Sequence, residues 1–356
     1  MRQFHSLTVA KKTRETRDSV RIALAVPPEL REEFTFLPGQ HLPIEIVRDG
    51  KPLRRTYSIC SVPGEWPLQI GVRVQQGGMF SEFAANELHV GDQLEVMSPF
   101  GQFHASPEAD SDKLYLAFAA GSGITPILSI IAALLRDEPR SRISLFYGNR
   151  RQTTTMFIED LYALKNRYPD RLQLQCVFSQ EDQEFPIGAG RLDRDKVREL
   201  YESFCRGTHP DEAFVCGPDT MIETVTAALA ELGIDTDRIH SERFGAPRKR
   251  RRETAPPPAA GLDAAAVTVI LDGHKKSFDM ADTDDNIVDA AAEHGIDLPY
   301  SCKGGVCATC RCHLREGEVT MATNFGLEPW EVEKGFILAC QSRPTSKRLV
   351  LDYDKT

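Results

Sequence analysis

The feature that most constrains this chain is a group of cysteines near its C-terminus. Cys302, Cys307 and Cys310 follow the spacing C-x4-C-x2-C, and Cys340 follows after 29 further residues. Four thiolates at this spacing hold a [2Fe–2S] cluster. Glycines inside the first loop let the backbone turn tightly and aim its N–H groups at sulfur. The spacing therefore predicts these four cysteines as cluster ligands.

A structural zinc ion is the alternative occupant of such a site. Zinc sites favour two paired C-x2-C knuckles, whereas Cys340 stands alone after a short apolar run, so the cluster is favoured. Cys312 would share a face with Cys310 if a strand begins there, and we expect it to be a small buried residue. The other cysteines outside the motifs are expected to be packing residues: Cys60, Cys176 and Cys205.

The length and charge of the chain limit its architecture and its partners. With 356 residues it is too long for one ordinary core, and a net charge of −9 argues against a nucleic-acid binder as a whole. No apolar run approaches the roughly 20 residues that span a bilayer. The N-terminus lacks the apolar stretch of a signal peptide, and clustered cysteines suit metal binding inside a cell. A cytoplasmic protein of several domains is expected.

The first part of the chain, residues 1–108, has the pattern of a β domain. Short apolar runs at Val20–Val26, Leu68–Val74 and Gln93–Met97 are separated by Pro-Gly, Gly-Gly and Gly-Asp turns. Frequent short strands with such turns indicate a barrel or a sandwich.

Residues 109–244 change to alternating strands and helices. The continuous apolar run Leu114–Ala120 is typical of a strand buried on both faces, and a helix is expected from Pro126 to about Arg136. Further strands are predicted at Ile143–Tyr147, Leu172–Phe178 and Ala213–Cys216, with helices over Phe157–Asn166 and from Asp219 to Leu232. This alternation predicts a parallel α/β sheet.

Residues 245–266 are predicted to be a linker, and 267–356 a final domain. The linker contains the basic run Arg248–Arg252 and three consecutive prolines, so it cannot bury an apolar face. A nucleic-acid or nuclear-targeting patch is the alternative interpretation of the basic run. The last domain begins with a hairpin pattern over Val267–Phe278 and a short helix at Ile287–His294.

A cluster passes one electron at a time, whereas a nicotinamide gives up two as hydride, so a flavin is needed between them. Two short motifs indicate where it binds. They are Arg55-Thr56-Tyr57-Ser58 and Gly77-Gly78-Met79-Phe80-Ser81. The first matches the R-x-Y-S pattern of the ferredoxin–NADP⁺ reductase family, and the second resembles that family's other flavin motif. Pro99–Phe103 resembles the strand end that closes its FAD barrel.

The chemistry of these residues suits the roles that the resemblance implies. Arg55 offers a planar fork for a pyrophosphate, and Tyr57 can stack on the flavin ring. Ser58 can hydrogen-bond near the atom that receives hydride. Gly77 and Gly78 let backbone amides approach phosphate, and Ser81 is expected to cap the helix that follows.

The strand Leu114–Ala120 runs into a glycine turn, Gly121-Ser122-Gly123-Ile124-Thr125-Pro126. Thr125 is predicted as the helix N-cap and Pro126 as the first helical residue, so that the helix N-terminus faces a pyrophosphate. The G-x-G-x-T-P form resembles the reductase family rather than the G-x-G-x-x-G dinucleotide fingerprint. Gly121, Gly123, Thr125 and Pro126 are therefore candidate nucleotide contacts.

Two further motifs complete the candidate nucleotide site. Asn149, Arg150 and Arg151 follow the next strand, where the family binds the adenine ribose, and the arginines suit the 2′-phosphate of NADPH. NADH remains open as the alternative. Cys216-Gly217-Pro218 matches the family's C-G-P motif beside the nicotinamide, and Ser58 and Cys216 are the candidate catalytic residues. Glu242-Arg243-Phe244 closes this part, and Phe244 is expected to cover the flavin.

The resemblance to the reductase family, joined to a plant-type ferredoxin, covers almost the whole chain. It implies a β-barrel FAD domain, an α/β NAD(P) domain and an α+β ferredoxin domain of the β-grasp type. The stretches FHSLTVAK, LPGQH, FAAGSGITPIL, SLFYGNR, YSCKGGVCATC and MATNFGLEP resemble reductase components of ring-epoxidising complexes that act on phenylacetyl-CoA. Electrons would then go from NADPH through FAD and the cluster to a di-iron oxygenase, without nucleic acid or membrane as a partner. Another oxygenase, a demethylase or a hybrid-cluster protein is the alternative acceptor, and an iron–sulfur redox sensor is a third interpretation.

Overall fold

The computed structural model describes residues 3–48, 50–205, 207–244, 264–281, 283–327 and 329–355. The chain forms two compact units. The larger contains Phe4–Leu53 and Tyr57–Phe244, and the smaller contains the C-terminal residues together with Arg54–Thr56. The predicted linker lies outside the described residues, except for its last three. Those three alanines already belong to a strand, because they pair with residues 279–281.

The N-terminal part of the larger unit is a six-stranded sheet in the order β4-β3-β6-β1-β2-β5. Its strands are β1 (Phe4–Thr16), β2 (Ser19–Ala25), β3 (His41–Arg48), β4 (Lys51–Ser58), β5 (Leu68–Arg73) and β6 (Gln93–Met97). The β1–β2, β1–β6, β2–β5 and β3–β6 pairs are antiparallel. An antiparallel bridge from Ile59, directly after β4, to Ile70 on β5 joins the two outer strands. The sheet thus closes on itself around an apolar core, as a barrel does.

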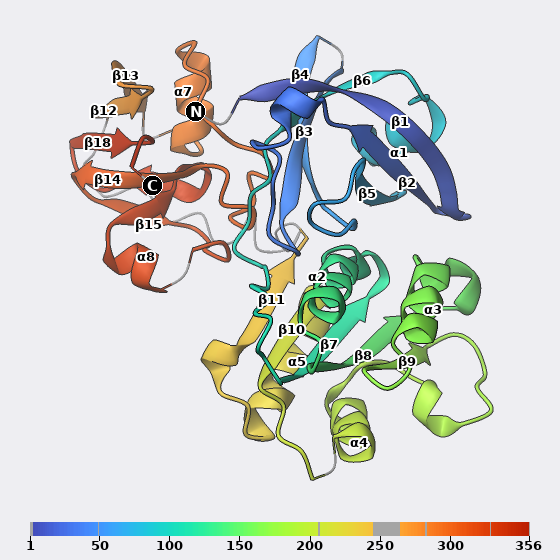
Figure 1. Cartoon of the computed structure of the whole chain (residues 1–356). Helices are drawn as coiled ribbons and strands as arrows, with labels where there is room; N and C mark the ends of the chain where they lie inside the picture. Colours follow the sequence, from blue (N-terminus) through green and yellow to red (C-terminus); the bar gives the residue numbers. More distant parts are fainter. Residues whose placement is uncertain are drawn as a thin grey trace. The chain divides into compact units, whose positions relative to one another are not determined.

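The second part of the larger unit is a parallel sheet in the order β11-β10-β7-β8-β9. Its strands are β7 (Leu114–Ala120), β8 (Arg142–Asn149), β9 (Leu172–Phe178), β10 (Glu212–Gly217) and β11 (Ile239–Arg243). Its helices are α2 (Ile124–Asp137), α3 (Ile158–Arg167), α4 (Arg194–Phe204) and α5 (Asp219–Glu231). Figure 1 shows these helices beside the strands they connect.

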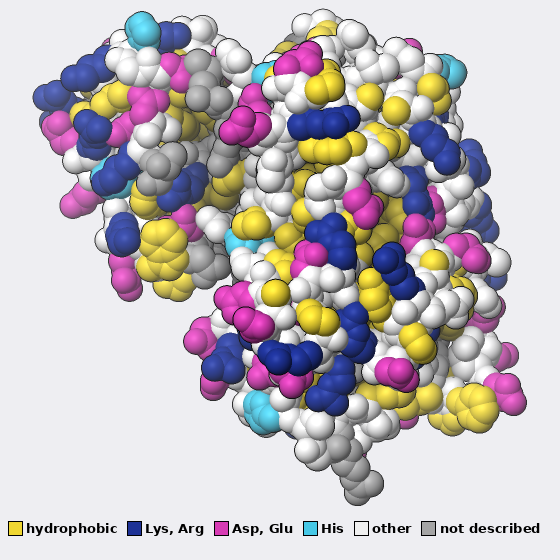
Figure 2. Space-filling view, viewed as in Figure 1, with side chains coloured by type: hydrophobic (Ala, Val, Ile, Leu, Met, Phe, Trp, Pro, Cys, Tyr) yellow, Lys and Arg dark blue, Asp and Glu magenta, His cyan; other side chains and the backbone are white. Residues whose placement is uncertain are grey.

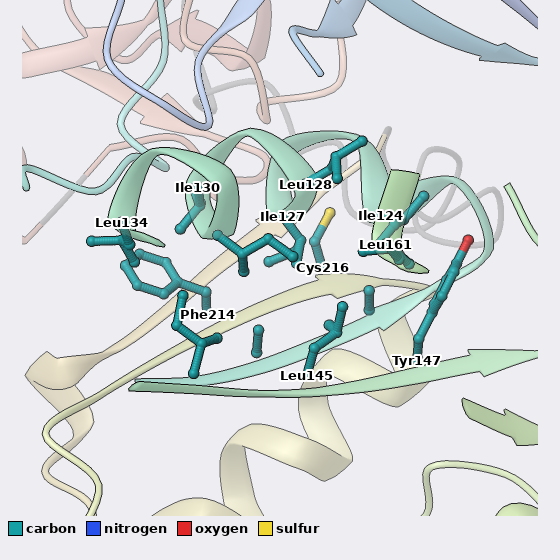
Figure 3. Close-up of a cluster of buried hydrophobic side chains, with 14 of the residues drawn as sticks. Ile124, Ile127, Leu128, Ile130, Leu134, Leu145, Tyr147, Leu161, Phe214 and Cys216 are labelled. Carbon is teal, nitrogen blue, oxygen red and sulfur yellow. The ribbon is translucent and has the colours of Figure 1, made fainter. Parts of the chain in front are cut away.

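Helices cover both faces of this sheet. Alternate residues of each strand point to opposite faces, so each strand contributes side chains to two cores. Along β7, Tyr115 and Ala117 join a core with α2 and α3, whereas Leu116 and Phe118 join a second core with α4 and α5. Figure 3 shows Ile124, Ile127, Leu128 and Leu134 of α2 in the first core, together with side chains from β8 and β10. The predicted α/β domain is confirmed.

Helix α2 also joins the sheet to the barrel. Its residues from Ile124 to Leu135 are all buried, as expected for a helix that is covered on every side. The Ser129 hydroxyl donates a 2.7 Å hydrogen bond to the carbonyl of Ser61, which lies in the barrel part. Cys60, Phe103 and Ala105 of the barrel part also join the core around α2, so the two parts pack against each other and contacts between them can form a site.

The C-terminal unit contains a mixed sheet in the order β13-β12-β18-β14-β16 and a separate pair, β15 and β17. The strands are β12 (Ala264–Leu271), β13 (His274–Ala281), β14 (Arg311–Glu316), β15 (Val319–Met321), β16 (Phe336–Leu338), β17 (Ser342–Pro344) and β18 (Arg348–Asp352). The helices are α7 (Ile287–Glu293) and α8 (Pro329–Glu333). β12 and β18 are parallel and the other pairs antiparallel, which fits the α+β prediction. The first strand begins three residues earlier than predicted.

Shorter elements connect these parts. A single helix, α1 (Met79–Asn86), lies between β5 and β6. The 3-10 turns are η1 (Pro28–Leu30), η2 (Gly121–Gly123), η3 (Gln152–Thr154), η4 (Pro186–Gly188), η5 (Thr236–Arg238) and η6 (Ala339–Gln341). Acidic and basic side chains are interspersed over the face shown in Figure 2. That face therefore offers no extended surface of one charge.

Candidate functional site

Strand β4 presents the first flavin motif. Arg55 is exposed, Tyr57 is half-buried and Ser58 is only 4% exposed. The Tyr57 ring packs against Phe80 of α1 with 4.9 Å between centroids. The two predicted flavin motifs are thus in contact, because Tyr57 belongs to the first and Phe80 to the second. The exposed position of Arg55 and the partly exposed position of Tyr57 suit the roles predicted for them.

The second motif begins in a left-handed turn and continues into α1. Gly77 has φ +75°, and its N–H donates to Glu82 Oε1 at 2.8 Å. The prediction that Ser81 caps this helix is wrong, because Gly78 occupies the N-cap position. The Ser81 hydroxyl instead accepts from the Gln75 N–H at 3.1 Å and donates to the Gly78 carbonyl. It closes the turn from inside the helix, while Met79 stays half-exposed.

The glycine turn after β7 differs from the prediction at the helix start. Gly121, with φ +55°, opens the 3-10 turn η2, and α2 begins directly after it at Ile124. Thr125 is therefore not the N-cap, and its hydroxyl donates to the Ser122 carbonyl at 3.0 Å. Pro126 is the third helical residue, where its missing N–H is still harmless. The backbone turn, rather than a side-chain cap, fixes where this helix begins.

Gly123 packs directly on the C-G-P motif. A Cβ at Gly123 would lie 2.1 Å from the Cys216 carbonyl oxygen, so only glycine fits there. Gly217 ends β10, and Pro218 precedes the first turn of α5. The turn predicted to face the pyrophosphate and the motif predicted to lie beside the nicotinamide are thus in contact.

Ser58 and Cys216, the two candidate catalytic residues, converge on Glu242. The Ser58 hydroxyl donates to Glu242 Oε2 at 3.3 Å, and Cys216 pairs with Glu242 across β10 and β11. The Cys216 side chain is fully buried. Burial, followed by the charge of Glu242, raises the pKa of the Cys216 thiol well above its usual value. The thiol therefore stays protonated at neutral pH.

Two residues that sequence reasoning did not single out complete this region. His41 Nδ1 lies 3.3 Å from Glu242 Oε1, whereas Ser58 contacts the other carboxylate oxygen. Arg73 forms an ion pair with Asp18 at 2.9 Å, and its Nη1 would lie 3.0 Å from a Cβ at Gly121. The available signals were weak: His41 is a polar residue opening a strand after Pro-Gly-Gln, and Arg73 ends a strand close to the second flavin motif.

The end of β8 carries the residues predicted to bind the adenine ribose. Asn149 is 8% exposed, and its Nδ2 has no hydrogen-bond partner among the described residues. Arg150 and Arg151 are exposed, and neither forms an ion pair with any residue that the structure describes. At the end of β11, Arg243 pairs with Asp219 at 2.9 Å, and Phe244 is 48% exposed. The role of Phe244 over the flavin stays a prediction.

The four predicted cluster cysteines lie as two pairs in the C-terminal unit. The Cys302 sulfur accepts hydrogen bonds from the N–H groups of Gly304 at 3.3 Å and Cys307 at 3.4 Å. The Cys307 thiol and these backbone donors lower the pKa of Cys302. The Cys340 side chain, followed by burial, raises the pKa of Cys310 well above its usual value, so these two side chains also lie next to each other. Two thiols per metal are what each iron of a [2Fe–2S] cluster requires, whereas a single zinc ion would need all four around one centre.

Cys312 lies in β14 and is 1% exposed, as expected for a packing residue. Burial raises the pKa of its thiol, and the Tyr353 hydroxyl lies close enough to oppose that shift. Cys60 and Cys205 are also buried, and Cys176 is half-buried.

Three family descriptions match successive parts of the chain. An oxidoreductase FAD-binding domain covers residues 6–105, an oxidoreductase NAD-binding domain 118–227, and a 2Fe-2S iron-sulfur cluster binding domain 269–345. One of the subunits of 1,2-phenylacetyl-CoA epoxidase from Escherichia coli (strain K12) is 46% identical over 99% of both chains. The chain belongs to the ferredoxin–NADP⁺ reductase family.

Another relative of this reductase is the ferredoxin reductase component of 3-ketosteroid-9-alpha-monooxygenase from Rhodococcus rhodochrous. It is 36% identical over 98% of this chain and 96% of its own. Among solved structures, phthalate dioxygenase reductase covers 98% of both chains with 25% identity and a TM-score of 0.59. That protein is described as a modular structure for electron transfer from pyridine nucleotides to [2Fe-2S]. This reductase is an oxidoreductase that uses FAD, NAD(P)H and a [2Fe–2S] cluster.

The geometry of the reductase fits these cofactors. The buried Nδ2 of Asn149 has no hydrogen-bond partner among the described residues, and the turn at Gly121–Gly123 precedes a helix N-terminus. The four predicted cluster cysteines form two pairs, and two backbone N–H groups donate to the Cys302 sulfur. Where the structure describes the chain, no helix is both long enough and apolar enough to cross a membrane.

Proposed function

We propose that this reductase carries electrons from NADPH, through FAD and its [2Fe–2S] cluster, to a di-iron oxygenase that acts on phenylacetyl-CoA. The observation that carries the proposal is the 46% identity to a component of the E. coli epoxidase over 99% of both chains. Identity at that level over three successive domains leaves no domain of the relative unmatched. The family fold alone would support only the reductase class.

The proposed binding residues follow from the placement of the motifs. FAD would be held by residues 55–58 of β4 and by residues 77–81 around the start of α1. The nucleotide would be held by the turn Gly121–Gly123, by Thr125 and Pro126, and by Asn149–Arg151 and Cys216–Pro218. When bound, the flavin accepts hydride and the cluster accepts single electrons. The protein's part is to bring Ser58, Cys216 and Glu242 together and to keep the Cys216 thiol protonated.

The preference for NADPH rests on Arg150 and Arg151. Both guanidinium groups are exposed at the end of β8 without an ion pair among the described residues, so they are available for a 2′-phosphate. Arg150→Ala should lower kcat/KM for NADPH about tenfold and leave that for NADH nearly unchanged. Arg142→Ala is the matched control, because Arg142 is exposed at the opposite end of the same strand. A wild-type preference for NADH would refute the assignment.

The acceptor is identified by reconstitution. The reductase is mixed with the oxygenase component of the E. coli epoxidase, and NADPH oxidation is followed with phenylacetyl-CoA and with buffer alone. We expect oxidation that depends on both the oxygenase and phenylacetyl-CoA, with formation of the epoxide. The 36% identical steroid monooxygenase component supports a second candidate, so its oxygenase partner is the parallel assay. NADPH oxidation that depends on the steroid oxygenase alone would identify the steroid oxygenase, rather than the epoxidase, as the acceptor.

We also propose that the reductase works in the cytoplasm. None of the nine cysteines forms a disulfide in the structure, and cysteines outside disulfides persist in reducing compartments. The redox-sensor interpretation depended on the basic run Arg248–Arg252, which lies outside the described residues. A sensor would also need neither a flavin domain nor a nucleotide domain.

A further inference from the structure

His41 is held in a fixed orientation at the start of β3. Its N–H donates to the Phe100 carbonyl at 2.8 Å, and its carbonyl accepts from the Phe100 N–H at 2.9 Å. The imidazole edge packs on the Phe100 ring with 5.8 Å between centroids. A Cβ at Gly101, where φ is +136°, would lie 3.0 Å from the imidazole. The ring is therefore confined on several sides and is only 4% exposed.

The confined imidazole faces Glu242. Nδ1 of His41 lies 3.3 Å from Oε1, and the Ser58 hydroxyl lies 3.3 Å from Oε2, so each carboxylate oxygen has one partner. The Glu242 side chain is 11% exposed. Hydrogen bonds to opposite oxygens of a carboxylate fix its rotation about the last side-chain bond. Without His41, one oxygen would lose its partner and the carboxylate could turn away from Ser58.

We propose that His41 is a positioning residue for hydride transfer, acting by donating from Nδ1 to Glu242 so that the carboxylate orients Ser58. This inference rests on the proposed function, because it assumes that Ser58 lies where hydride is transferred. His41 Nε2 is buried and has no partner among the described residues, so the ring is not held by a second hydrogen bond. Its contact with Glu242 is therefore the polar contact that selects its tautomer.

Two substitutions separate positioning from packing. Asparagine can place an amide N–H close to the Nδ1 position, whereas leucine fills similar space without a donor. In the FAD-loaded full chain, His41→Leu should slow the limiting rate of flavin reduction by NADPH about tenfold, measured by anaerobic stopped flow. His41→Asn should stay within about threefold of the wild type, and the Kd for NADPH should change in neither variant. Equal losses in both variants would refute positioning and leave a packing role.

A double-mutant cycle tests whether His41 acts through Glu242. In a Glu242→Ala background, His41→Leu should cause little further loss, because the carboxylate that His41 orients is gone. If the two losses multiply instead, His41 acts by another route and the proposal fails.

The hydrogen bond between His41 and Glu242 can also be detected by a measurement that does not depend on catalysis. The full chain labelled with ¹⁵N-histidine should give a long-range ¹H–¹⁵N spectrum in which His41, assigned by its absence in His41→Asn, carries its proton on Nδ1. Glu242→Ala should remove that preference. An unprotonated Nδ1 in the wild type would overturn the inference. If NADPH and NADH both fail to reduce the wild-type flavin while Nδ1 is protonated, the proposed function fails and the hydrogen bond stands.

Discussion

Gly123 and Cys216 lie in direct backbone contact, although they are far apart in the chain: a Cβ on the glycine would come within 2.1 Å of the cysteine's carbonyl oxygen and 2.5 Å of its carbonyl carbon. The contact joins the turn after β7 to the end of β10, which are neighbouring parallel strands. Their carboxyl ends therefore form one surface, as in other open α/β sheets.

The first prediction concerns this contact. Gly123→Ala should force the turn away from β10, lower the midpoint of thermal unfolding by several degrees and weaken NADPH binding. Overpacking of a filled site costs about 1–3 kcal/mol. Gly188→Ala is the matched control, because the nearest atom to its Cβ would be 3.5 Å away, an ordinary contact. Differential scanning fluorimetry and NADPH titration measure the two effects. Equal behaviour of the two variants would show that the turn can move freely.

The fold could largely be predicted from local patterns. The apolar run Leu114–Ala120 is buried on both faces as expected, and the glycine turn follows it directly. The start of a helix was harder to predict, because Thr125 and Ser81 are both good capping residues. In each case a backbone turn at glycine comes first and leaves the hydroxyl inside the helix.

The contact between His41 and Glu242 could not be predicted from the sequence. The two residues are 201 positions apart, and no local pattern links the start of β3 to the end of β11. Only the packing of the barrel against the parallel sheet brings them together. Sequence motifs located Ser58 and Cys216, but they did not show that both converge on one carboxylate.

The second prediction concerns the acid stability of the parallel sheet. Hydrogen bonds from His240 and Lys113 lower the pKa of Glu212 from 4.5 to about 2. Because the folded pKa lies below the unfolded one, this carboxylate stabilises the fold above pH 4.5 and loses that effect as the pH falls toward 2. Glu212→Gln should lower stability at pH 7 by about 1 kcal/mol, since the group is partly exposed.

Thermal unfolding of Glu212→Gln and wild type at several pH values checks this expectation. The difference between them should shrink as the pH falls below 4.5. Glu202→Gln is the control, because Glu202 is exposed on α4. A difference that stays constant down to the acid limit would show that the charge of Glu212 is not what stabilises the sheet.

The third prediction concerns the cysteines outside the cluster. Burial raises the pKa of Cys60 to about 12 and that of Cys176 and Cys205 to about 11. At pH 8, about one thiol in a thousand or fewer would be ionised, and the thiolate is the form that reacts. Iodoacetamide should therefore leave these three unmodified in the native holoprotein and modify them after denaturation, as read by peptide mass spectrometry. Rapid native labelling of Cys60 would contradict its burial.

The last prediction separates cluster ligands from a buried neighbour. Cys307 contacts Cys302 and the Thr309 hydroxyl, whereas Cys312 is a buried residue of β14. Cys307→Ala should abolish the electron paramagnetic resonance signal of the reduced cluster and stop electron delivery to the acceptor, while NADPH still reduces the flavin. Cys312→Ala should keep the signal, because removing a non-ligand thiol leaves four ligands in place. Unimpaired delivery by Cys307→Ala would place the cluster outside the electron path, and loss of the signal in Cys312→Ala would show that this buried thiol is needed to assemble the site.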